Sequence, residues 1–188
     1  MKRQTIPLLG YALMGLLQQK PSSGYDLRKI FAHTPMGTFS DSPGAIYPAL
    51  HRLEEQGLIG GHVEARGALR KRKVFRLKST GAEELTRWLA QPVTRADVIR
   101  GRRGLMLRFA FSEGAAGAEA AIRLLRSLQT ELQAYIPFLR EHLKSQQEKM
   151  PFSGRLALEG GVMEYEAQLQ WTRNALVAYE RKKRAEKS

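Results

Sequence analysis

The sequence predicts a mostly α protein. One small β-hairpin gives its first domain α+β character. Apolar residues recur at steps of three and four through much of the chain, and two short segments near residue 70 alternate polar and apolar residues. With 188 residues and 43% hydrophobic content, the chain can bury a core as one domain or as two small ones. We therefore expect helices, then a hairpin, then a largely helical second half.

The charge balance is strongly basic, because 31 lysine and arginine residues outnumber 18 aspartate and glutamate residues and leave a formal net charge of +13. This excess favours a polyanionic partner, nucleic acid before an anionic membrane surface, over a protein that is merely basic. The chain contains no cysteine, which excludes disulfides and thiolate metal sites and is compatible with the cytoplasmic location that we expect.

No pattern of residues supports catalysis. The histidines are scattered without the spacing of metal ligands, and neither a phosphate-binding glycine loop nor a nucleophile motif occurs. The adjacent Glu54 and Glu55 diverge on a helix. We therefore expect no enzymatic activity, no metal and no cofactor.

The first predicted helix begins near Thr5 and Pro7 and ends at Lys20-Pro21. Its apolar run, residues 6–17, follows two basic residues, as in a signal peptide. However, no small-x-small cleavage site follows, and the run is too short to cross a bilayer. A buried helix explains the run better, and we expect no membrane partner.

Two more helices follow, each with a recognisable start. Ser23 and Asp26 have the spacing of a capping box and begin the second helix. Ser42 as N-cap and Pro43 at the first helical position begin the third helix, which Gly57 ends.

Pro48 lies about two turns inside the third helix, where its ring removes an amide donor and crowds the carbonyl four residues earlier. That earlier residue is Gly44, which lets the first turn relax. We therefore predict a slightly opened helix start, where Gly44 and Ala45 allow a close approach to a groove. The alternative is a late helix start, with residues 42–46 forming a separate turn.

Residues 62–65 and 73–77 predict two strands of a β-hairpin. Its tip and return strand hold a basic cluster: Arg66, Arg70, Lys71, Arg72 and Lys73. Thr80 to Glu83 has the pattern of a capping box for a fourth helix that reaches Leu89. Pro92 and nearby glycines then mark a boundary. We divide the chain into a first domain at 1–91, a linker and start of the C-terminal region at 92–113, and a helical domain at 114–188.

The second half is predicted to be largely helical. From residue 118 to 143 the apolar positions fall at steps of three and four, and Pro137 should kink that helix. Farther along, two series repeat every seven residues with an offset of three: Val162, Tyr165, Leu169, Thr172, Leu176 and Tyr179. This seam predicts packing on another helix, and we expect it to form a homodimer, although an intramolecular hairpin would bury it equally well.

Three helices followed by a two-stranded hairpin is the order of a winged helix-turn-helix domain, whose third helix enters the major groove of double-stranded DNA. The outward face of that helix would present Ser42, Gly44, Ala45, Tyr47, Pro48, His51 and Arg52. We expect Tyr47, His51 and Arg52 to read base edges, and only Arg52 can make a bidentate pair with guanine. The basic hairpin would contact phosphates; the alternative is an ordinary solvated loop.

Three stretches resemble the PadR family of bacterial transcriptional regulators in order and spacing: SGYDLRK (23–29), SPGAIYPALHRLEEQGLI (42–59) and RKVFRLKSTGAEEL (72–85). The internal Tyr47-Pro48 is the most distinctive element. The resemblance implies a homodimer that binds an inverted-repeat operator, usually as a repressor, and that in some relatives is released by phenolic or other aromatic molecules. One departure is the Ala-Leu stretch in the hairpin tip, which leaves individual contacts of the wing open.

The family's DNA contacts carry over to the start of the second helix, the outward face of the third, and the wing. At the second helix these positions are Ser23, Gly24 and Tyr25, where free amides can also bind a phosphate on physical grounds. Tyr25 is equally suited to packing.

Trp88 and Trp171 are candidates to line a pocket for a small aromatic effector, although core or interface packing is the commoner use of tryptophan. Two other functions remain open. One is a sequence-independent nucleic-acid binder, for RNA or for the nucleoid, and the other is a winged-helix module for protein interaction.

Overall fold

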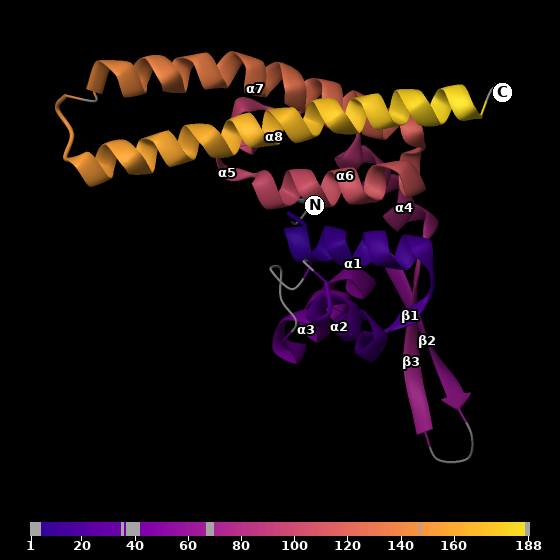
Figure 1. Cartoon of the computed structure of the whole chain (residues 1–188). Helices are drawn as coiled ribbons and strands as arrows, with labels where there is room; N and C mark the ends of the chain where they lie inside the picture. The colour runs from indigo at the N-terminus through magenta and orange to yellow at the C-terminus, as the bar shows by residue number, and fades with distance from the viewer. Residues whose placement is uncertain (1–4, 35, 37–41, 67–69, 147, 187–188) are drawn as a thin grey trace. The chain divides into compact units, whose positions relative to one another are not determined.

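The computed structural model describes residues 5–34, 36, 42–66, 70–146 and 148–186, with only the backbone described at 65, 66, 70 and 71. In chain order, the elements are α1 (Leu8–Gln19), β1 (Ser22–Ser23), α2 (Gly24–Ala32), α3 (Pro43–Glu55), β2 (Ile59–Arg66), β3 (Arg70–Leu77), α4 (Ser79–Leu89), α5 (Arg95–Arg100), α6 (Arg102–Ala116), α7 (Ala118–Gln146) and α8 (Phe152–Ala185) (Figure 1). The predicted fold class, mostly helical with a winged helix-turn-helix followed by long C-terminal helices, is confirmed.

The chain divides into two compact units. The first unit contains Met1–Leu89 and Gly114–Ala116, and the second contains Ala90–Glu113 and Gly117–Ser188. The segment expected as a linker, residues 92–113, contains helix α5 and most of helix α6. Among the described residues, no helix combines the length and the apolar character that crossing a bilayer requires.

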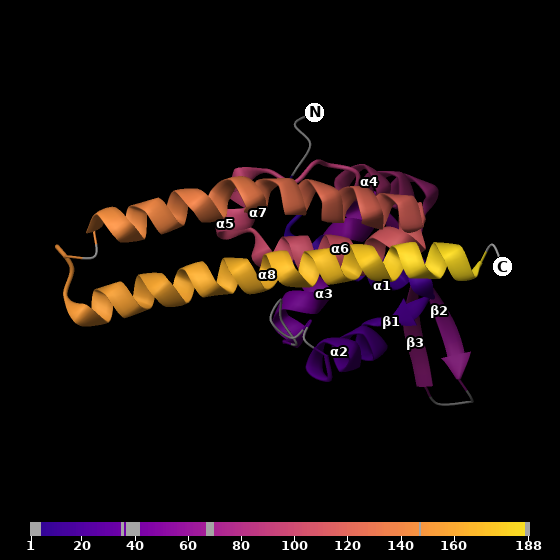
Figure 2. The same cartoon turned by 45° about the horizontal axis from the view of Figure 1, so that its top comes forward.

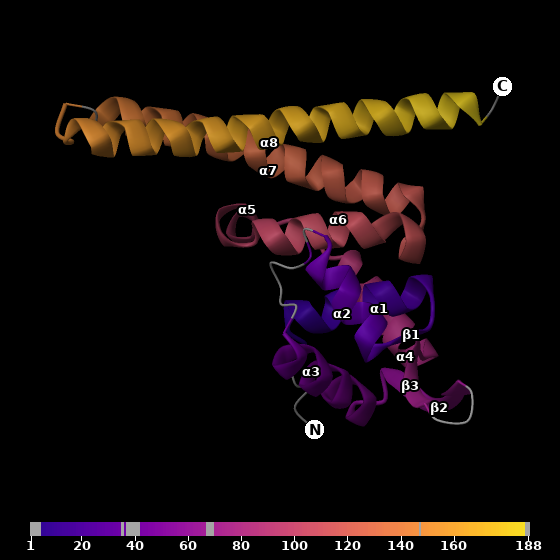
Figure 3. The ribbon, with the colours of Figure 1, turned by 60° about the horizontal axis from the view of Figure 1, so that its bottom comes forward.

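The core of the first unit forms around α1, whose apolar run is buried as predicted: Ala12, Leu13, Met14, Leu16 and Leu17. Helix α3 packs against both α1 and α2 (Figure 3). It contributes Ile46 and Leu50, which are fully buried. The amphipathic pattern of α3 therefore holds one of its faces in the domain and leaves the other face outside.

A small antiparallel sheet in the order β1-β3-β2 completes the first unit. The wing strands β2 and β3 pair over their full length, with Ile59 opposite Leu77 and Arg66 opposite Arg70. The two-residue strand β1, which the sequence did not predict, adds Ser22 and Ser23 to the other edge of β3. The wing strands extend beyond the helices of this unit (Figure 1). Residues 67–69 lie outside the described part of the chain.

One junction joins the end of α3, the start of β2 and the start of α4. Gly57 has a positive φ of 70°, and the amide of Lys78 donates to the Leu58 carbonyl. The capping box predicted at Thr80 is wrong, because α4 begins at Ser79 and the Thr80 hydroxyl donates instead to the Gly57 carbonyl at 2.7 Å. A Cβ on Gly81 would collide with the Leu58 carbonyl oxygen, so this close approach requires glycine.

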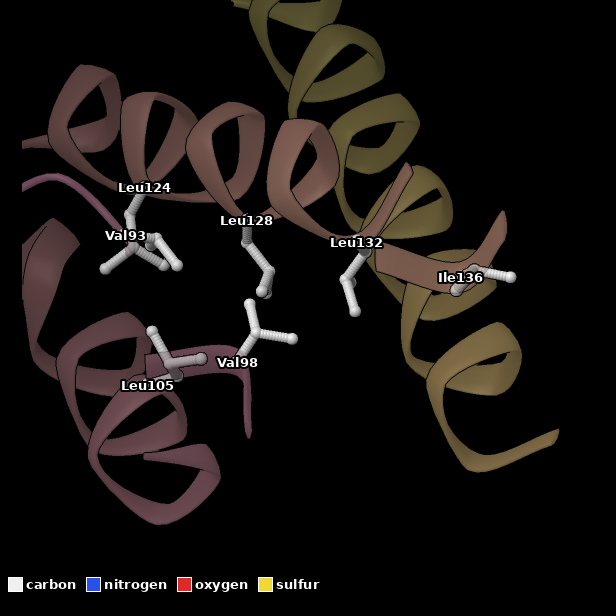
Figure 4. Close-up of a cluster of buried hydrophobic side chains, with 7 residues drawn as sticks. All are labelled: Val93, Val98, Leu105, Leu124, Leu128, Leu132 and Ile136. Atoms are coloured by element: carbon white, nitrogen blue, oxygen red, sulfur yellow. The ribbon is translucent and has the colours of Figure 1, made fainter. Parts of the chain in front are cut away.

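The core of the second unit lies between α5, α6 and α7. Its buried cluster is Val93, Val98, Leu105, Leu124, Leu128, Leu132 and Ile136 (Figure 4). Four of these residues come from α7, and three of the four, Leu128, Leu132 and Ile136, lie at apolar positions predicted for that helix. The Arg108 side chain is also buried and donates a hydrogen bond to the Gln91 carbonyl, and its burial lowers the pKa of the guanidinium.

Helices α7 and α8 lie side by side as a long pair (Figures 1 and 2). Residues of the predicted seam pack within this unit. Val162 is 6% exposed and Thr172 fully buried in the single chain, and the Tyr165 ring meets Tyr135 edge to face at 5.1 Å. The Tyr179 hydroxyl donates to Glu113 at 2.8 Å. Five seam residues, Val162, Tyr165, Leu169, Thr172 and Tyr179, are thus buried or in contact within the single chain, and Leu176 is half-buried. The homodimer expected from this seam stays a prediction.

The junction at Gly81 generates a stability prediction. Gly81→Ala should lower the free energy of unfolding by about 1–3 kcal/mol, because the new methyl group forces backbone apart. Gly114→Ala in α6 is the matched control: a Cβ there meets no described atom within 4 Å, so the helix should gain up to about 1 kcal/mol. Urea denaturation measures both variants, and equal stability of the two would contradict the account of the junction.

Candidate nucleic-acid interface

The start of α2 is fixed by the predicted capping box. The Ser23 hydroxyl accepts a hydrogen bond from the Asp26 amide at 3.2 Å, and the Ser23 amide donates to the Asp26 carboxylate at 3.3 Å. Ser23 and Gly24 are buried, whereas Tyr25 is 52% exposed with the Lys29 ammonium 4.9 Å from its ring centre. Tyr25 is therefore not a core residue, and α2 presents one aromatic side chain outward at its start.

Helix α3 is continuous from Pro43 and contains Pro48, so the late-start alternative is wrong. The Ser42 hydroxyl accepts from the Gly44 amide at 3.2 Å, as an N-cap does, and the Ile46 amide donates to the Ser42 carbonyl at 3.1 Å. Because proline has no amide hydrogen, the Gly44 carbonyl lacks its usual helical donor. Gly44 is exposed, so water or a ligand can reach this carbonyl.

The outward face of α3 carries the predicted side chains. Tyr47 is 48% exposed, and Pro48, His51 and Arg52 are exposed as well, while Ala45 is half-buried. The His51 ring lies 3.3 Å from the Glu55 carboxylate on the next turn. We call Tyr25, Tyr47, Pro48, His51 and Arg52 the α2–α3 face.

Gly24 brings the two helices of this face into contact. A Cβ on Gly24 would lie 2.5 Å from the nearest ring carbon of Tyr47, which is tighter than side chains tolerate. Gly24 therefore acts by giving room to the Tyr47 ring. The sequence suggested separate DNA contacts for Gly24 and Tyr47; in the structure the two residues are in direct contact with each other.

Two of the five wing cations are ion-paired within the chain. An Arg72 guanidinium nitrogen lies 3.4 Å from the Asp26 carboxylate on α2, and a second lies 3.6 Å from Glu64. The Lys73 ammonium lies 2.6 Å from the Glu54 carboxylate on α3. The sequence did not predict these pairs. The other three predicted cations, Arg66, Arg70 and Lys71, have side chains outside the described part of the structure.

The pKa values of Asp26, Glu54 and Glu64 all lie below the ordinary values of these side chains, for different main causes. The hydrogen bond from the Ser23 hydroxyl is the main cause for Asp26, and the one from the Lys73 ammonium is the main cause for Glu54. The hydrogen bond with His62 is the main cause for Glu64. All three carboxylates are thus held in the charged form, inside a region that is otherwise basic.

The two tryptophans pack against aromatic rings of their own units. Trp88 stacks on Tyr11 with ring centres 4.2 Å apart and is 9% exposed. Trp171 meets Phe109 edge to face at 5.2 Å. A cavity of about 350 Å³ lies elsewhere, between the start of α1 and α3, and its lining includes Arg52 but neither tryptophan. Among the described residues, no cluster of histidine and acidic side chains is placed to hold a metal ion.

The comparisons with known proteins agree with the motifs of the first unit. Residues 13–87 match the model of the transcriptional regulator PadR-like family. The chain is 33% identical over 88 residues to the negative transcriptional regulator PadR of Bacillus subtilis, covering 46% of this chain and 48% of that one. It is 32% identical over 94 residues to the transcriptional regulator YqjI of Escherichia coli, covering 50% and 42%. The chain spans about half the length of the curated relatives that it matches.

Among solved structures, B. subtilis PadR in complex with operator DNA aligns with 92% of this chain and 99% of its own length, at 23% identity and a TM-score of 0.43. The same protein in complex with p-coumaric acid aligns with 93% and 99%, at 23% identity and a TM-score of 0.41. The PadR-like regulator of Bacillus cereus aligns with 93% and 99%, at 26% identity and a TM-score of 0.40.

The capping box gives a prediction with a pH dependence. The pKa of Asp26 in the folded protein is lowered from its ordinary value of 3.8. The charged Asp26 carboxylate therefore stabilises the fold fully above pH 3.8, and this stabilisation is lost as the pH falls through the lowered folded-state pKa. Asp26→Ala should therefore cost about 1 kcal/mol of unfolding free energy at pH 7 and less at pH 3. Urea unfolding of the variant and the unmodified protein at both pH values measures this, and a gap that does not change with pH would contradict it.

Proposed function

The chain belongs, through residues 13–87, to the PadR-like family of transcriptional regulators, and on that premise we propose that it regulates transcription by binding double-stranded DNA through the α2–α3 face and the wing. The family is one of regulators and not of enzymes. The observation that carries the proposal is the division of α3, which buries Ile46 and Leu50 and leaves Tyr47, His51 and Arg52 exposed on the opposite side.

On this proposal α3 lies in the major groove. Arg52 can donate two hydrogen bonds to one guanine, while Tyr47 and His51 contact neighbouring base edges. A good bidentate pair discriminates by about 1–3 kcal/mol against the wrong base. Gly44 and Ala45 add little side-chain volume at the start of α3, which lets its backbone, with Ser42 and Pro48, approach the DNA closely.

Phosphate contacts would position the protein without reading sequence. The exposed Tyr25 supports one such contact at the start of α2. Ser23 and Gly24 are buried, and the Ser23 amide already donates to Asp26, so we assign both residues to shaping this helix start. The wing residues Arg66, Arg70 and Lys71 supply further positive charge, and the formal net charge of +13 favours a polyanion overall.

We extend the proposal to repression at an inverted-repeat operator, because the Bacillus subtilis relative is a negative transcriptional regulator. Release by a small aromatic effector belongs to the proposal only through the family resemblance. The packing of Trp88 against Tyr11 and of Trp171 against Phe109 speaks for structural roles of both rings.

A homodimer is part of the proposal, with residues 1–91 as the DNA-binding part, residues 114–188 as the dimerisation part and 92–113 between them. Because most seam residues pack within the single chain, we propose another surface of α8 for the second copy. Leu156, Met163 and Val177 are 47%, 67% and 44% exposed and share one heptad register on α8. The exposed Gly160 and Ala167 lie between them and allow close helix approach. We call these five residues the outer α8 face.

Selection from a random duplex library tests the proposed function. A regulator should prefer its selected sequence over bulk DNA by about 10³-fold or more at a stated salt concentration. Arg52→Ala should relax the choice at one base pair, while Arg123→Ala, which removes an exposed arginine of α7, should leave the selected sequence unchanged. Equal binding to random duplexes would favour the sequence-independent binder, and no binding to DNA would favour the protein-interaction module.

The outer α8 face gives a separate prediction. Met163→Glu places a charge in the middle of this face and should convert a dimer to a monomer in light scattering. Operator affinity should then fall by about 10²-fold or more, since two half-sites are no longer bound together. Gln133→Glu on the exposed side of α7 is the control. A Met163→Glu protein that remains dimeric, or an unmodified protein that is monomeric, would refute the outer α8 face.

A further inference from the structure

Three acidic residues lie within the region that we assign to DNA binding: Asp26 on α2, Glu54 on α3 and Glu64 on β2. On charge alone each of them should repel a polyanion and weaken binding. Each, however, is bonded to a cation of the wing, so their effect on binding depends on what those bonds hold in place.

Glu54 joins the last turn of α3 to both wing strands. One carboxylate oxygen lies 2.6 Å from the Lys73 ammonium on β3, and the other accepts the Gly61 amide of β2 at 3.1 Å. The site is close-fitting, since a Cβ on Gly61 would lie 2.8 Å from the carboxylate and collide with the Lys73 side chain. The absence of a side chain at Gly61 therefore permits the contact between α3 and the wing.

Asp26 joins the first turn of α2 to the same strand. Its carboxylate lies 3.4 Å from Arg72, which also reaches Glu64 directly across the β2–β3 ladder. Since consecutive residues of a strand point to opposite faces, Arg72 and Lys73 hold β3 from two sides. One side is tied to α2 and the other to α3, the two helices of the α2–α3 face.

We propose that Asp26 and Glu54 are positioning residues that strengthen DNA binding by fixing the wing relative to α2 and α3, with Arg72 and Lys73 as their partners rather than as phosphate contacts. The inference rests on the proposed function and changes the assignment of two wing residues within it. On charge alone, removing the negative charge of Glu54 should strengthen binding to a polyanion. The proposal predicts the opposite, that removing this charge weakens binding.

Two neighbouring acids of α3 provide the test. Glu54→Gln and Glu55→Gln make the same change in net charge, but Glu55 contacts only His51 on its own helix among the contacts described for it. With the selected operator at fixed salt, Glu54→Gln should weaken binding by about two- to fivefold, in line with the worth of a partly exposed ion pair. Glu55→Gln should bind as tightly as the unmodified protein or more tightly. Tighter binding by both variants would overturn the proposal.

The salt dependence separates positioning from phosphate contact at Lys73. Loss of a phosphate contact lowers the slope of log affinity against log salt by about 0.9. Lys73→Gln should weaken binding with the slope unchanged, Lys73→Arg should restore affinity, and the double variant Glu54→Gln/Lys73→Gln should be no weaker than Lys73→Gln alone. A slope reduced by about 0.9 in Lys73→Gln would make Lys73 a phosphate contact and overturn the proposal.

Failure of this inference is distinguishable from failure of the proposed function. If the unmodified protein shows no preference for any duplex, the regulator proposal fails and the positioning roles fall with it. If it binds its operator specifically while Glu54→Gln binds more tightly, only the positioning roles fail. Melting temperatures of all variants, measured without DNA, establish that each is folded at the temperature of the binding experiment.

Discussion

The structure depends on the way α3 is held by its inner face. Ile46 and Leu50 are fully buried, and Leu53 is 3% exposed, so this helix is anchored by the same core that contains α1 and α2. Truncating a buried leucine to alanine typically costs about 2–5 kcal/mol, a large fraction of the stability of a small domain. Because the inner face of α3 is buried in the core, the exposed side chains on its opposite face are held in a defined direction.

Hydrogen bonds also hold the end of α3, in addition to the burial of its inner face. The last turn of α3 bonds to the wing through Glu54, and the residues just after it bond to Lys78 and Thr80 at the start of α4. Helix, strand and following helix therefore share one junction. Only a few residues separate these elements, so the same bonds limit how far the wing can move relative to α3 and α4.

The sequence predicted best those features whose partners are close along the chain. The Ser23–Asp26 cap and the start of α3 at Pro43 each involve residues within four positions, so their pattern is sufficient. The Thr80 hydroxyl finds its acceptor 23 positions away, and Arg72 bonds to Asp26 across 46 positions. Such pairs follow from the packing of whole elements, which local patterns do not contain. The heptads of α8 likewise predicted a seam without specifying which helix would cover it.

The contact between Gly24 and Tyr47 links two residues that lie on different helices. Because the ring occupies the space where a Cβ would stand, any larger residue at position 24 must displace the tyrosine or be accompanied by a smaller residue at position 47. The two positions should thus vary as a pair among related chains. Coevolution of a glycine with an aromatic residue would then reflect steric fit at this helix crossing and not a shared contact with a ligand.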